Sequence, residues 1–264
     1  MVKLDIAFDE VENIKNIKEL SVVFYPDSFF YGLWDNEETL VKSDSHSNAN
    51  FGKIYSILNK TYKLKIVRVM STVKPYVHLP REDYEKKYYK DYFDGVYDVS
   101  KRKSSKKDVD DFLREEITTL HYMDKPIMKT MRDSKVSYKT AHISTALASY
   151  TFLVDAEVIC FISESKIHIC HAKNGKFQLY NQYHCEQAED YLYYILLVLD
   201  HFKLHPHEDA IHIGGHINVD SPLMKLLKAY IKNIIIVDEN LNLPSSNLVA
   251  KQYYYDLYLC KSCV

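Results

Sequence analysis

The stretches EVICFIS (residues 157–163) and KIHICHA (residues 166–172) are rich in β-branched and other apolar residues, and only two residues separate them. They predict a β-hairpin. A third strand is expected at residues 174–185, because the Asn-Gly dipeptide that opens it is typical of hairpin turns. Residues 186–204 are apolar nearly all round their middle, as in a helix that is buried on several sides. The stretch DAIHIGG (residues 209–215) is the next strand, so the order is three strands, a helix and a strand.

The beginning of the chain has the same order of elements. LSVVFYP (residues 20–26) and FFYGLWD (residues 29–35) predict a hairpin, and ETLVKSD (residues 38–44) predicts a third strand. Apolar residues at helical spacing indicate a helix over residues 47–64, and KIVRVMST (residues 65–72) returns to a strand. The sequence therefore predicts an α/β protein with two βββαβ-type halves.

The two halves are expected at residues 1–150 and 151–264, although no Gly/Ser/Pro-rich linker marks a boundary. The first half contains an irregular insert around residues 80–115. Within it, alternating charge and tyrosine at residues 80–95 predict a helix. In the second half, the stretch NIIIV (residues 233–237) predicts a final buried strand.

Composition limits the classes of function. The chain has 264 residues, a net charge of -2 and a pI near 6.6, which give no general attraction to nucleic acid or anionic membranes. The basic run at residues 101–107 is followed at once by DVDD, so an exposed loop is favoured over a phosphate contact.

The longest apolar run, residues 191–199, is about half the roughly 20 residues that span a bilayer. The start of the chain has no apolar signal-peptide core, and the five cysteines are an odd number, so we expect a cytoplasmic protein with reduced thiols.

Two copies of three antiparallel strands, a helix and a parallel strand resemble the plan of the actin-like ATPase (ribonuclease H-like) fold. More narrowly, NGKFQLYN, EDYLYYILLVLDHFKL and the strand that ends in glycines resemble the bacterial domain-of-unknown-function family 3822. The opening LSVVFYPDSFFYGLWD also resembles the first hairpin of that family. This resemblance covers most of the chain and is densest over residues 157–217. It implies an actin-like fold and no known activity.

The resemblance raises the question of a nucleotide site. In actin-like ATPases the first hairpin turn of each half faces the phosphates and carries Asp, Gly and then Ser or Thr, so that backbone N–H groups approach the phosphate oxygens. The N-terminal turn here, YPDSFF, has Asp27 and Ser28 but no glycine. The C-terminal turn, ISESKI, begins with Ser163 and has neither glycine nor aspartate. The third element of such sites, a strand that ends in glycines and passes over the adenosine, is present as Gly214–Gly215.

Two functional hypotheses follow. The leading one is a non-catalytic protein with a degenerate nucleotide site and no cofactor, which acts through protein–protein contacts. Its inter-domain cleft would be narrowed by Phe29 and Phe30, and the glycine pair would serve close packing. The alternative is a nucleotide-binding protein, a weak ATPase or kinase-like, that holds ATP and Mg²⁺. Its site residues would be Asp27, Ser28, Ser163, Gly214 and Gly215.

Other patterns point to no further chemistry. No Ser/His/Asp set, P-loop or dinucleotide-binding fingerprint has a supporting context, so we predict no catalytic residue. Only HPH (residues 205–207) and CKSC (residues 260–263) have spacings that suggest a metal, and a zinc site needs four convergent ligands, so no metal is expected. The tyrosine-rich stretches at residues 86–98 and 251–259 could form a surface for a protein partner or a homo-oligomer. The alternative is that these tyrosines fill half-buried positions in a tyrosine-rich chain.

Overall fold

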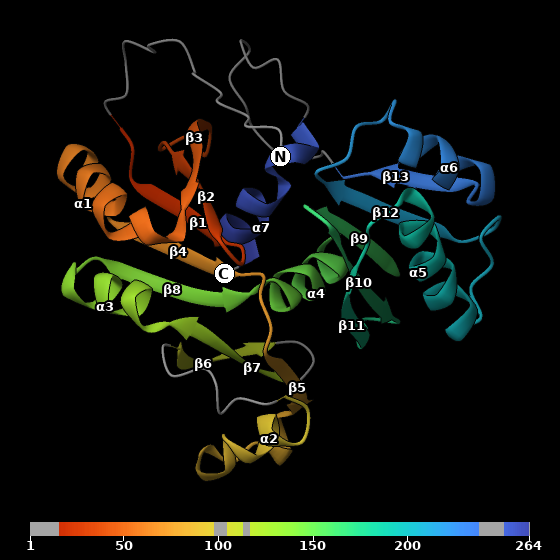
Figure 1. Ribbon diagram of the computed structural model, residues 1–264, viewed down its shortest axis with the longest axis horizontal. Helices are drawn as coiled ribbons and strands as arrows, with labels where there is room; N and C mark the ends of the chain where they lie inside the picture. The colour runs from red at the N-terminus through yellow and green to blue at the C-terminus, as the bar shows by residue number, and fades with distance from the viewer. Residues whose placement is uncertain (1–15, 98–104, 113–116, 238–250, 264) are drawn as a thin grey trace. The chain divides into compact units, whose positions relative to one another are not determined.

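The computed structural model describes residues 16–97, 105–112, 117–237 and 251–263 (Figure 1). These residues form two compact units. The N-terminal half contains the described residues up to 146 together with residues 257–263. The C-terminal half contains residues 147–237 and 251–256.

The N-terminal half is built on a five-stranded sheet. Its central strand β1 is antiparallel to β2 and parallel to β4, and the full strand order is β3-β2-β1-β4-β8. The elements in chain order are β1 (Glu19–Phe24), β2 (Ser28–Trp34), β3 (Leu40–Ser47), η1 (Asn48–Asn50), α1 (Phe51–Tyr62), β4 (Ile66–Ser71), α3 (Lys125–Asp133) and β8 (Ser137–His142). The predicted order of three strands, a helix and a strand is confirmed, and β8 is an additional strand at the edge.

The C-terminal half repeats this sheet strand for strand. Its order is β11-β10-β9-β12-β13, with β9 antiparallel to β10 and parallel to β12. The elements are β9 (Val158–Ser163), β10 (Lys166–Lys173), β11 (Lys176–His184), α5 (Ala188–His201), β12 (Ala210–Gly215), α6 (Pro222–Tyr230) and β13 (Asn233–Ile236). The two-half α/β fold predicted from the sequence is therefore confirmed. The prediction that the last strand is buried was wrong, because β13 is an edge strand whose residues are half-buried or exposed.

The insert forms a small sheet of its own, with strand order β5-β7-β6. Its elements are β5 (Tyr76–Pro80), η2 (Arg81–Asp83), η3 (Lys86–Tyr88), α2 (Asp91–Asp94), β6 (Ser105–Phe112) and β7 (Ile117–Asp124). The helix predicted over residues 80–95 was wrong: only short turns and the four-residue α2 form there, because Tyr89 and Phe93 pack onto Leu79 and Leu120 instead of lining one long helix. Residues 105–107 of the predicted basic loop belong to β6, and residues 101–104 lie outside the described residues.

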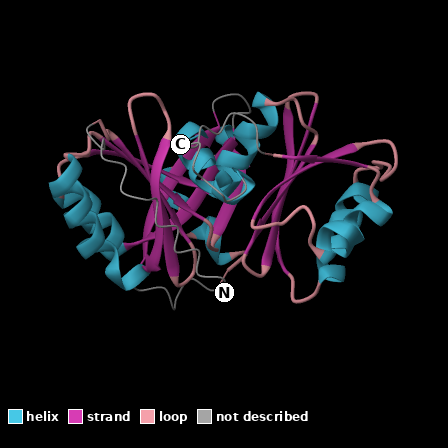
Figure 2. Cartoon of the chain, turned by 90° about the horizontal axis from the view of Figure 1, so that it is seen from above, coloured by secondary structure: helices cyan, strands magenta, loops and turns pink. Residues whose placement is uncertain are grey.

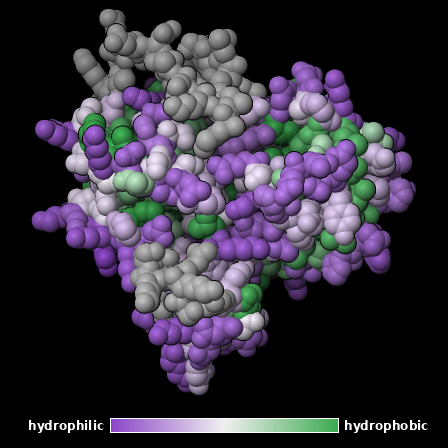
Figure 3. All heavy atoms as spheres, in the orientation of Figure 1, coloured by the Kyte–Doolittle hydropathy of each residue, from purple (hydrophilic) through white to green (hydrophobic). Residues whose placement is uncertain are grey.

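Helices cover the sheets of the two halves (Figures 1 and 2). In the N-terminal half, Phe51 and Tyr55 of α1 and Met128 of α3 pack into the core below β1, β2 and β4. In the C-terminal half, Ile195 of α5 and Met224 of α6 pack into the equivalent core. Apolar side chains recur every three or four residues in these helices, which puts them on the face that meets the sheet. Hydrophilic residues cover much of the molecular face that Figure 3 displays, with hydrophobic ones visible between them.

The remaining helices are α4 (Ile143–Leu153), η4 (Lys251–Tyr254) and α7 (Tyr255–Cys263). The last turns of α7 contact the sheet of the N-terminal half, where the Cys260 thiol donates to the carbonyls of Val22 and Arg68 over 3.6 and 3.4 Å. The Lys261 ammonium lies 3.0 Å from a carboxylate oxygen of Glu38 and over the Trp34 ring. The end of the chain is thus attached to its first strands.

Candidate functional site

The first hairpin turn, between β1 and β2, is closed by a side chain from a later part of the chain. The Asn48 side-chain amide donates to the carbonyls of Tyr25 and Pro26 over 2.9 and 3.2 Å, and its backbone N–H donates to the Asp27 carbonyl over 3.0 Å. The Tyr25 N–H donates to the Ser28 carbonyl over 2.8 Å, and Pro26 has no N–H. The turn therefore carries a ring of carbonyls around Asn48, and two of its four residues have no backbone N–H to offer an anion.

Phe29 lies in the core of the N-terminal half. It is 1% exposed, and its ring contacts those of Phe24 and Phe51 at centroid distances of 5.7 and 5.4 Å. The expectation that Phe29 narrows a cleft was therefore wrong. Alternation along β2 explains the error, because neighbouring residues of a strand point to opposite faces and Phe29 points towards α1. Phe30, its neighbour on β2, is half-buried.

The second hairpin turn, between β9 and β10, contains only Glu164 and Ser165, both of them exposed. Glu164 has a φ of 49°, a left-handed conformation that glycine or asparagine adopts more readily. The hydroxyl of Tyr191 on α5 donates to the Glu164 carbonyl over 3.3 Å. This turn is tight and carries a carboxylate at its tip.

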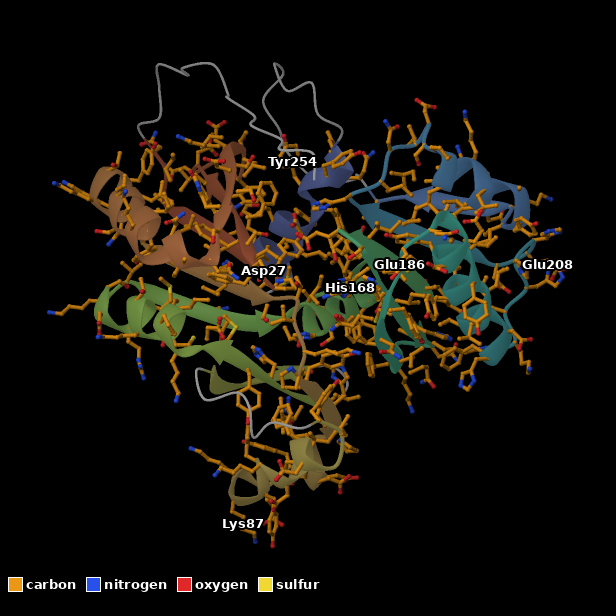
Figure 4. All side chains as sticks on the ribbon, in the orientation of Figure 1. Asp27, Lys87, His168, Glu186, Glu208 and Tyr254 are labelled. Atoms are coloured by element: carbon orange, nitrogen blue, oxygen red, sulfur yellow. The ribbon has the colours of Figure 1, made fainter. Side chains whose placement is uncertain are left out.

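Ser163 lies at the end of β9 in a buried chain of hydrogen bonds. Its hydroxyl oxygen is 2.8 Å from Nε2 of His168, whose Nδ1 is 2.8 Å from the Tyr180 hydroxyl. The exposed fractions are 2% for Ser163, 0% for His168 and 5% for Tyr180. Figure 4 shows His168 among the strands of the C-terminal half. Both ring nitrogens of His168 are hydrogen-bonded, so this chain of hydrogen bonds links β9, β10 and β11. The Ser163 hydroxyl is one of its members.

The glycine pair ends β12 against its neighbour β9. Gly215 has a φ of +93°, and a Cβ built on it would lie 2.1 Å from the carbonyl oxygen of Ile162. A Cβ on Gly214 would lie 3.3 Å from Cβ of Val237 and 3.5 Å from the Tyr255 ring. The N–H of His216 then donates to the same Ile162 carbonyl over 2.8 Å. Close contacts within the C-terminal half thus account for both glycines.

The structure brings three of the five predicted site residues together. Gly215 pairs with Ile162, so Ser163, Gly214 and Gly215 meet at the carboxyl ends of the parallel strands β9 and β12. Asp27 and Ser28 follow β1, at the carboxyl end of the corresponding strand in the N-terminal half. Asp27 is exposed and Ser28 half-buried. Ligands of open α/β sheets bind outside the carboxyl ends of the strands. The five predicted residues therefore lie where a ligand of such a sheet would bind.

The cysteines and histidines form no metal centre within the described residues: no group of three or more His, Cys, Asp or Glu side chains converges there. Cys160, Cys170, Cys185 and Cys260 are free and buried. Burial raises the pKa of the Cys160 thiol to about 12, so this side chain stays a neutral thiol at physiological pH. Such thiols behave as small apolar side chains.

Sequence reasoning missed Asn48, Pro26 and the His168 chain. The signal for Pro26 was available, since proline lacks a backbone donor. Asn48 and His168 had no local signal. The partners of Asn48 lie 23 and 22 positions away in the sequence, and those of His168 lie 5 and 12 positions away. Only the pairing of the strands brings these residues together.

The comparisons with known proteins agree with this fold. A protein of Bacteroides thetaiotaomicron VPI-5482 with an actin-like ATPase fold and unknown function superposes with a TM-score of 0.73 and 17% identity, over 97% of this chain and 99% of that one. The PilM–PilN type IV pilus biogenesis complex contains a chain that superposes with a TM-score of 0.59 and 10% identity, over 93% of this chain and 98% of that one.

No curated protein matches the sequence. None of the described helices combines the length and the apolar character needed to cross a lipid bilayer. The protein family described as "Protein of unknown function (DUF3822)" matches residues 12–234. The chain belongs to this family and has the actin-like ATPase fold.

Proposed function

We propose that this chain is a non-catalytic protein of the actin-like fold, in which the nucleotide site is degenerate and function is carried by contacts with other proteins. The observation that carries the proposal is the position of Asn48 in the first hairpin turn. Its side chain and backbone donate to three consecutive carbonyls, those of Tyr25, Pro26 and Asp27.

Electrostatics explains why this arrangement disfavours a phosphate. A triphosphate is bound by N–H donors that point at its oxygens, whereas a carbonyl oxygen repels it. Of the turn residues, Tyr25 already donates its N–H to Ser28 and Pro26 has none. A phosphate that displaced Asn48 would meet these carbonyl oxygens and would cost the hydrogen bonds from Asn48, each of which contributes about 0.5–1.5 kcal/mol.

The second turn supports the same conclusion independently. Its tip is the Glu164 carboxylate, and like charges repel by about 1 kcal/mol or more at partly screened distances of several ångströms. Ser163 corresponds to the phosphate-binding hairpin turn of actin-like ATPases. Here the Ser163 hydroxyl is hydrogen-bonded to His168. The loss of two backbone donors from the first turn and the engaged hydroxyl of Ser163 at the second both support a degenerate phosphate site.

Two observations support a role in protein contacts. The similar chain in the PilM–PilN complex belongs to an assembly of proteins, and its fold serves there in a protein complex. In the described part of this chain, Tyr88, Tyr193 and Tyr230 expose 45%, 59% and 52% of their surface. Exposed tyrosines supply a large contact area with a polar tip, which suits protein interfaces. The buried free thiols are typical of proteins in a reducing compartment and support the proposal that the protein is cytoplasmic.

A thermal-shift scan with Mg-ATP, Mg-ADP and AMP tests the proposal. A ligand present at a hundred times its dissociation constant stabilises the folded state by about 2.7 kcal/mol, a readily measured rise in Tm. We expect no rise with any of the three. A rise with Mg-ATP that Asp27→Ala abolishes, while the matched surface change Asp94→Ala leaves it intact, would establish the alternative, a nucleotide site that uses Asp27, Ser28, Ser163, Gly214 and Gly215. Asp27 and Asp94 are both exposed, so neither change should unfold the chain.

A further inference from the structure

Helices α1 and α3 lie next to each other on one face of the sheet in the N-terminal half (Figure 1). A Cβ built on Gly52 of α1 would lie 3.5 Å from the side-chain oxygen of Thr130 of α3. Each helix leads into a strand, α1 into β4 and α3 into β8, and these parallel neighbours start at the paired residues Ile66 and Ser137. The two helices therefore end at the same edge of the sheet, and their outer faces form one surface.

The stretches that contain these helices are strongly basic. Residues 51–65 include four lysines and no acidic residue, so their formal charge is +4. Residues 125–139 include four lysines, one arginine and Asp133, which also gives +4. Because the whole chain of 264 residues has a net charge of -2, the other 234 residues together carry -10. The small net charge thus averages a basic region with an acidic remainder, and this region can attract an anionic partner although the whole chain does not.

Six of the basic side chains are exposed on the two helices or directly after them, and within the described residues none of the six forms an ion pair. We call them the basic patch: Lys53, Lys60, Lys63, Lys129, Arg132 and Lys135. An apolar side chain lies among them. Ile57 is 52% exposed, and its spacing from Lys53 and Lys60 puts all three on the outer face of α1. The opposite face of α1 carries Phe51, Tyr55 and Leu58, which are buried in the core.

The chemistry of the basic patch favours a lipid surface over a nucleic acid or a protein. Five of its six residues are lysines, whereas arginine is preferred for planar, two-pronged recognition of phosphate, and lysine is depleted from protein interfaces. Single-stranded nucleic acids also stack their bases on aromatic side chains. α1 exposes none of its aromatic residues, and α3 has none. An exposed aliphatic side chain among lysines suits a membrane interface, where the charges meet anionic headgroups and apolar atoms enter the boundary with the acyl chains.

We propose that the basic patch docks the chain on an anionic lipid bilayer, with its lysines at the headgroup phosphates and Ile57 in the interface. Lys53 and Lys60 are separated by about 10 Å along the helix, so their charges act within about one Debye length of each other at 0.1 M salt. Both helices belong to one compact unit and present the patch on their outer faces, so docking needs no helix to leave the core. The contact is peripheral and requires no membrane-crossing helix.

The inference goes beyond the proposed function, because the partner is a lipid surface and not a protein. Tyr193 and Tyr230, which support the proposed protein contacts, lie in the C-terminal half, so the two partners would meet different surfaces. The two proposals can fail separately. Vesicle binding reports on the basic patch, and the nucleotide measurements report on the hairpin turns.

Co-sedimentation of the full chain with lipid vesicles tests the proposal. One set of vesicles is pure phosphatidylcholine, and the other contains about 30% of the anionic lipid phosphatidylglycerol. We expect binding to the anionic vesicles only. Raising the salt concentration to about 0.5 M should release the chain, because salt screens the attraction between the lysines and the headgroups.

Charge reversal on each helix shows whether the basic patch is responsible. The variants are Lys53→Glu/Lys60→Glu on α1 and Lys129→Glu/Arg132→Glu on α3. Each should weaken binding to the anionic vesicles about tenfold or more, since each removes two attractive charges and adds two repulsive ones. All four side chains are exposed, and circular dichroism checks that the variants keep the fold.

The matched control is Lys225→Glu/Lys228→Glu. It reverses two exposed lysines on α6 in the other half, so the net charge of the chain changes by the same amount. This control should bind the vesicles as the wild type does. Ile57→Ser leaves every charge in place and removes the apolar contact, so it should weaken binding about fivefold.

Three results would overturn the proposal. The first is no binding to the anionic vesicles at low salt. The second is binding that the two patch variants weaken no more than Lys225→Glu/Lys228→Glu does. The third is binding to a short DNA duplex, dependent on the basic patch, by a chain that does not bind the vesicles, because the partner would then be a nucleic acid.

Discussion

The backbone of Gly215 lies against the carbonyl oxygen of Ile162, where a Cβ would come within 2.1 Å of that oxygen. The two residues are partners in the parallel pairing of β12 with β9, and the Ile162 carbonyl also accepts the N–H of His216. A glycine at the end of β12 lets this strand turn away while its backbone stays in contact with β9. The position thus depends on glycine for a reason internal to the C-terminal half.

Gly215→Ala should destabilise the protein by about 2–4 kcal/mol, because the new methyl group meets backbone and the φ of +93° is a strained one for alanine. Gly95→Ala is the control, since nothing lies within 4 Å of a Cβ built there and its φ is -74°. Urea unfolding followed by circular dichroism measures both. Equal stabilities for the two variants would contradict this account of Gly215.

Asn48→Ala should lower the free energy of unfolding by about 0.5–1.5 kcal/mol, since the carbonyls of Tyr25 and Pro26 lose their donor. Asn50, two residues further on, is the N-cap of α1, but its side chain makes no capping hydrogen bond to this helix. Asn50→Ala should therefore change stability by only a few tenths of a kcal/mol. The same unfolding measurement applies. If Asn50→Ala proved the more harmful of the two, Asn48 would not be what holds the turn.

His171 makes stability depend on pH. It is 0% exposed, and within the described residues neither of its ring nitrogens has a hydrogen-bond partner. Burial, then the charges of Lys173 and His201, lower its pKa from 6.5 to about 4. The unfolded chain therefore binds a proton below pH 6.5 that the folded chain does not bind until about pH 4. Folding stability falls as pH decreases through this window.

His171→Phe should remove this contribution, because phenylalanine has a similar shape and can pack against Phe202, whose ring centroid is 4.0 Å from that of His171. Between pH 7 and pH 5 we expect the variant to lose about 2 kcal/mol less stability than the wild type. His207→Gln, a change at an exposed histidine, is the control and should follow the wild type. Unfolding at the two pH values measures the difference. Parallel losses in all three proteins would show that His171 does not titrate in this way.

Local patterns were sufficient for the order of elements. The hairpins at β1–β2 and β9–β10, and the Asn174–Gly175 turn into β11, depend on residues that are neighbours in sequence, and each was predicted. β8 was missed because SYKTAH alternates half-buried and exposed residues at a sheet edge and follows a long insert. β13 was predicted to be buried because it is apolar, yet apolar residues also occur on exposed edges.

The sequence predicted which residues the two hairpin turns of the candidate site contain. It did not predict the hydrogen bonds that these residues make. The absence of glycine from both turns can be read directly from YPDS and ISES. The bond from Asn48 to the first turn and the bonds of His168 to Ser163 and Tyr180 join residues from different strands or from a strand and a later helix. Such contacts follow from strand pairing, which no local pattern in one sequence specifies. The same limit explains Phe29, whose side of the strand was predicted wrongly.

The central claim, that the two hairpin turns cannot hold a triphosphate, is tested most directly by titrating the purified chain with Mg-ATP in an isothermal calorimeter. Our account predicts heats of dilution only, at every concentration of nucleotide. A saturable one-site binding curve that Asp27→Ala abolishes would contradict it.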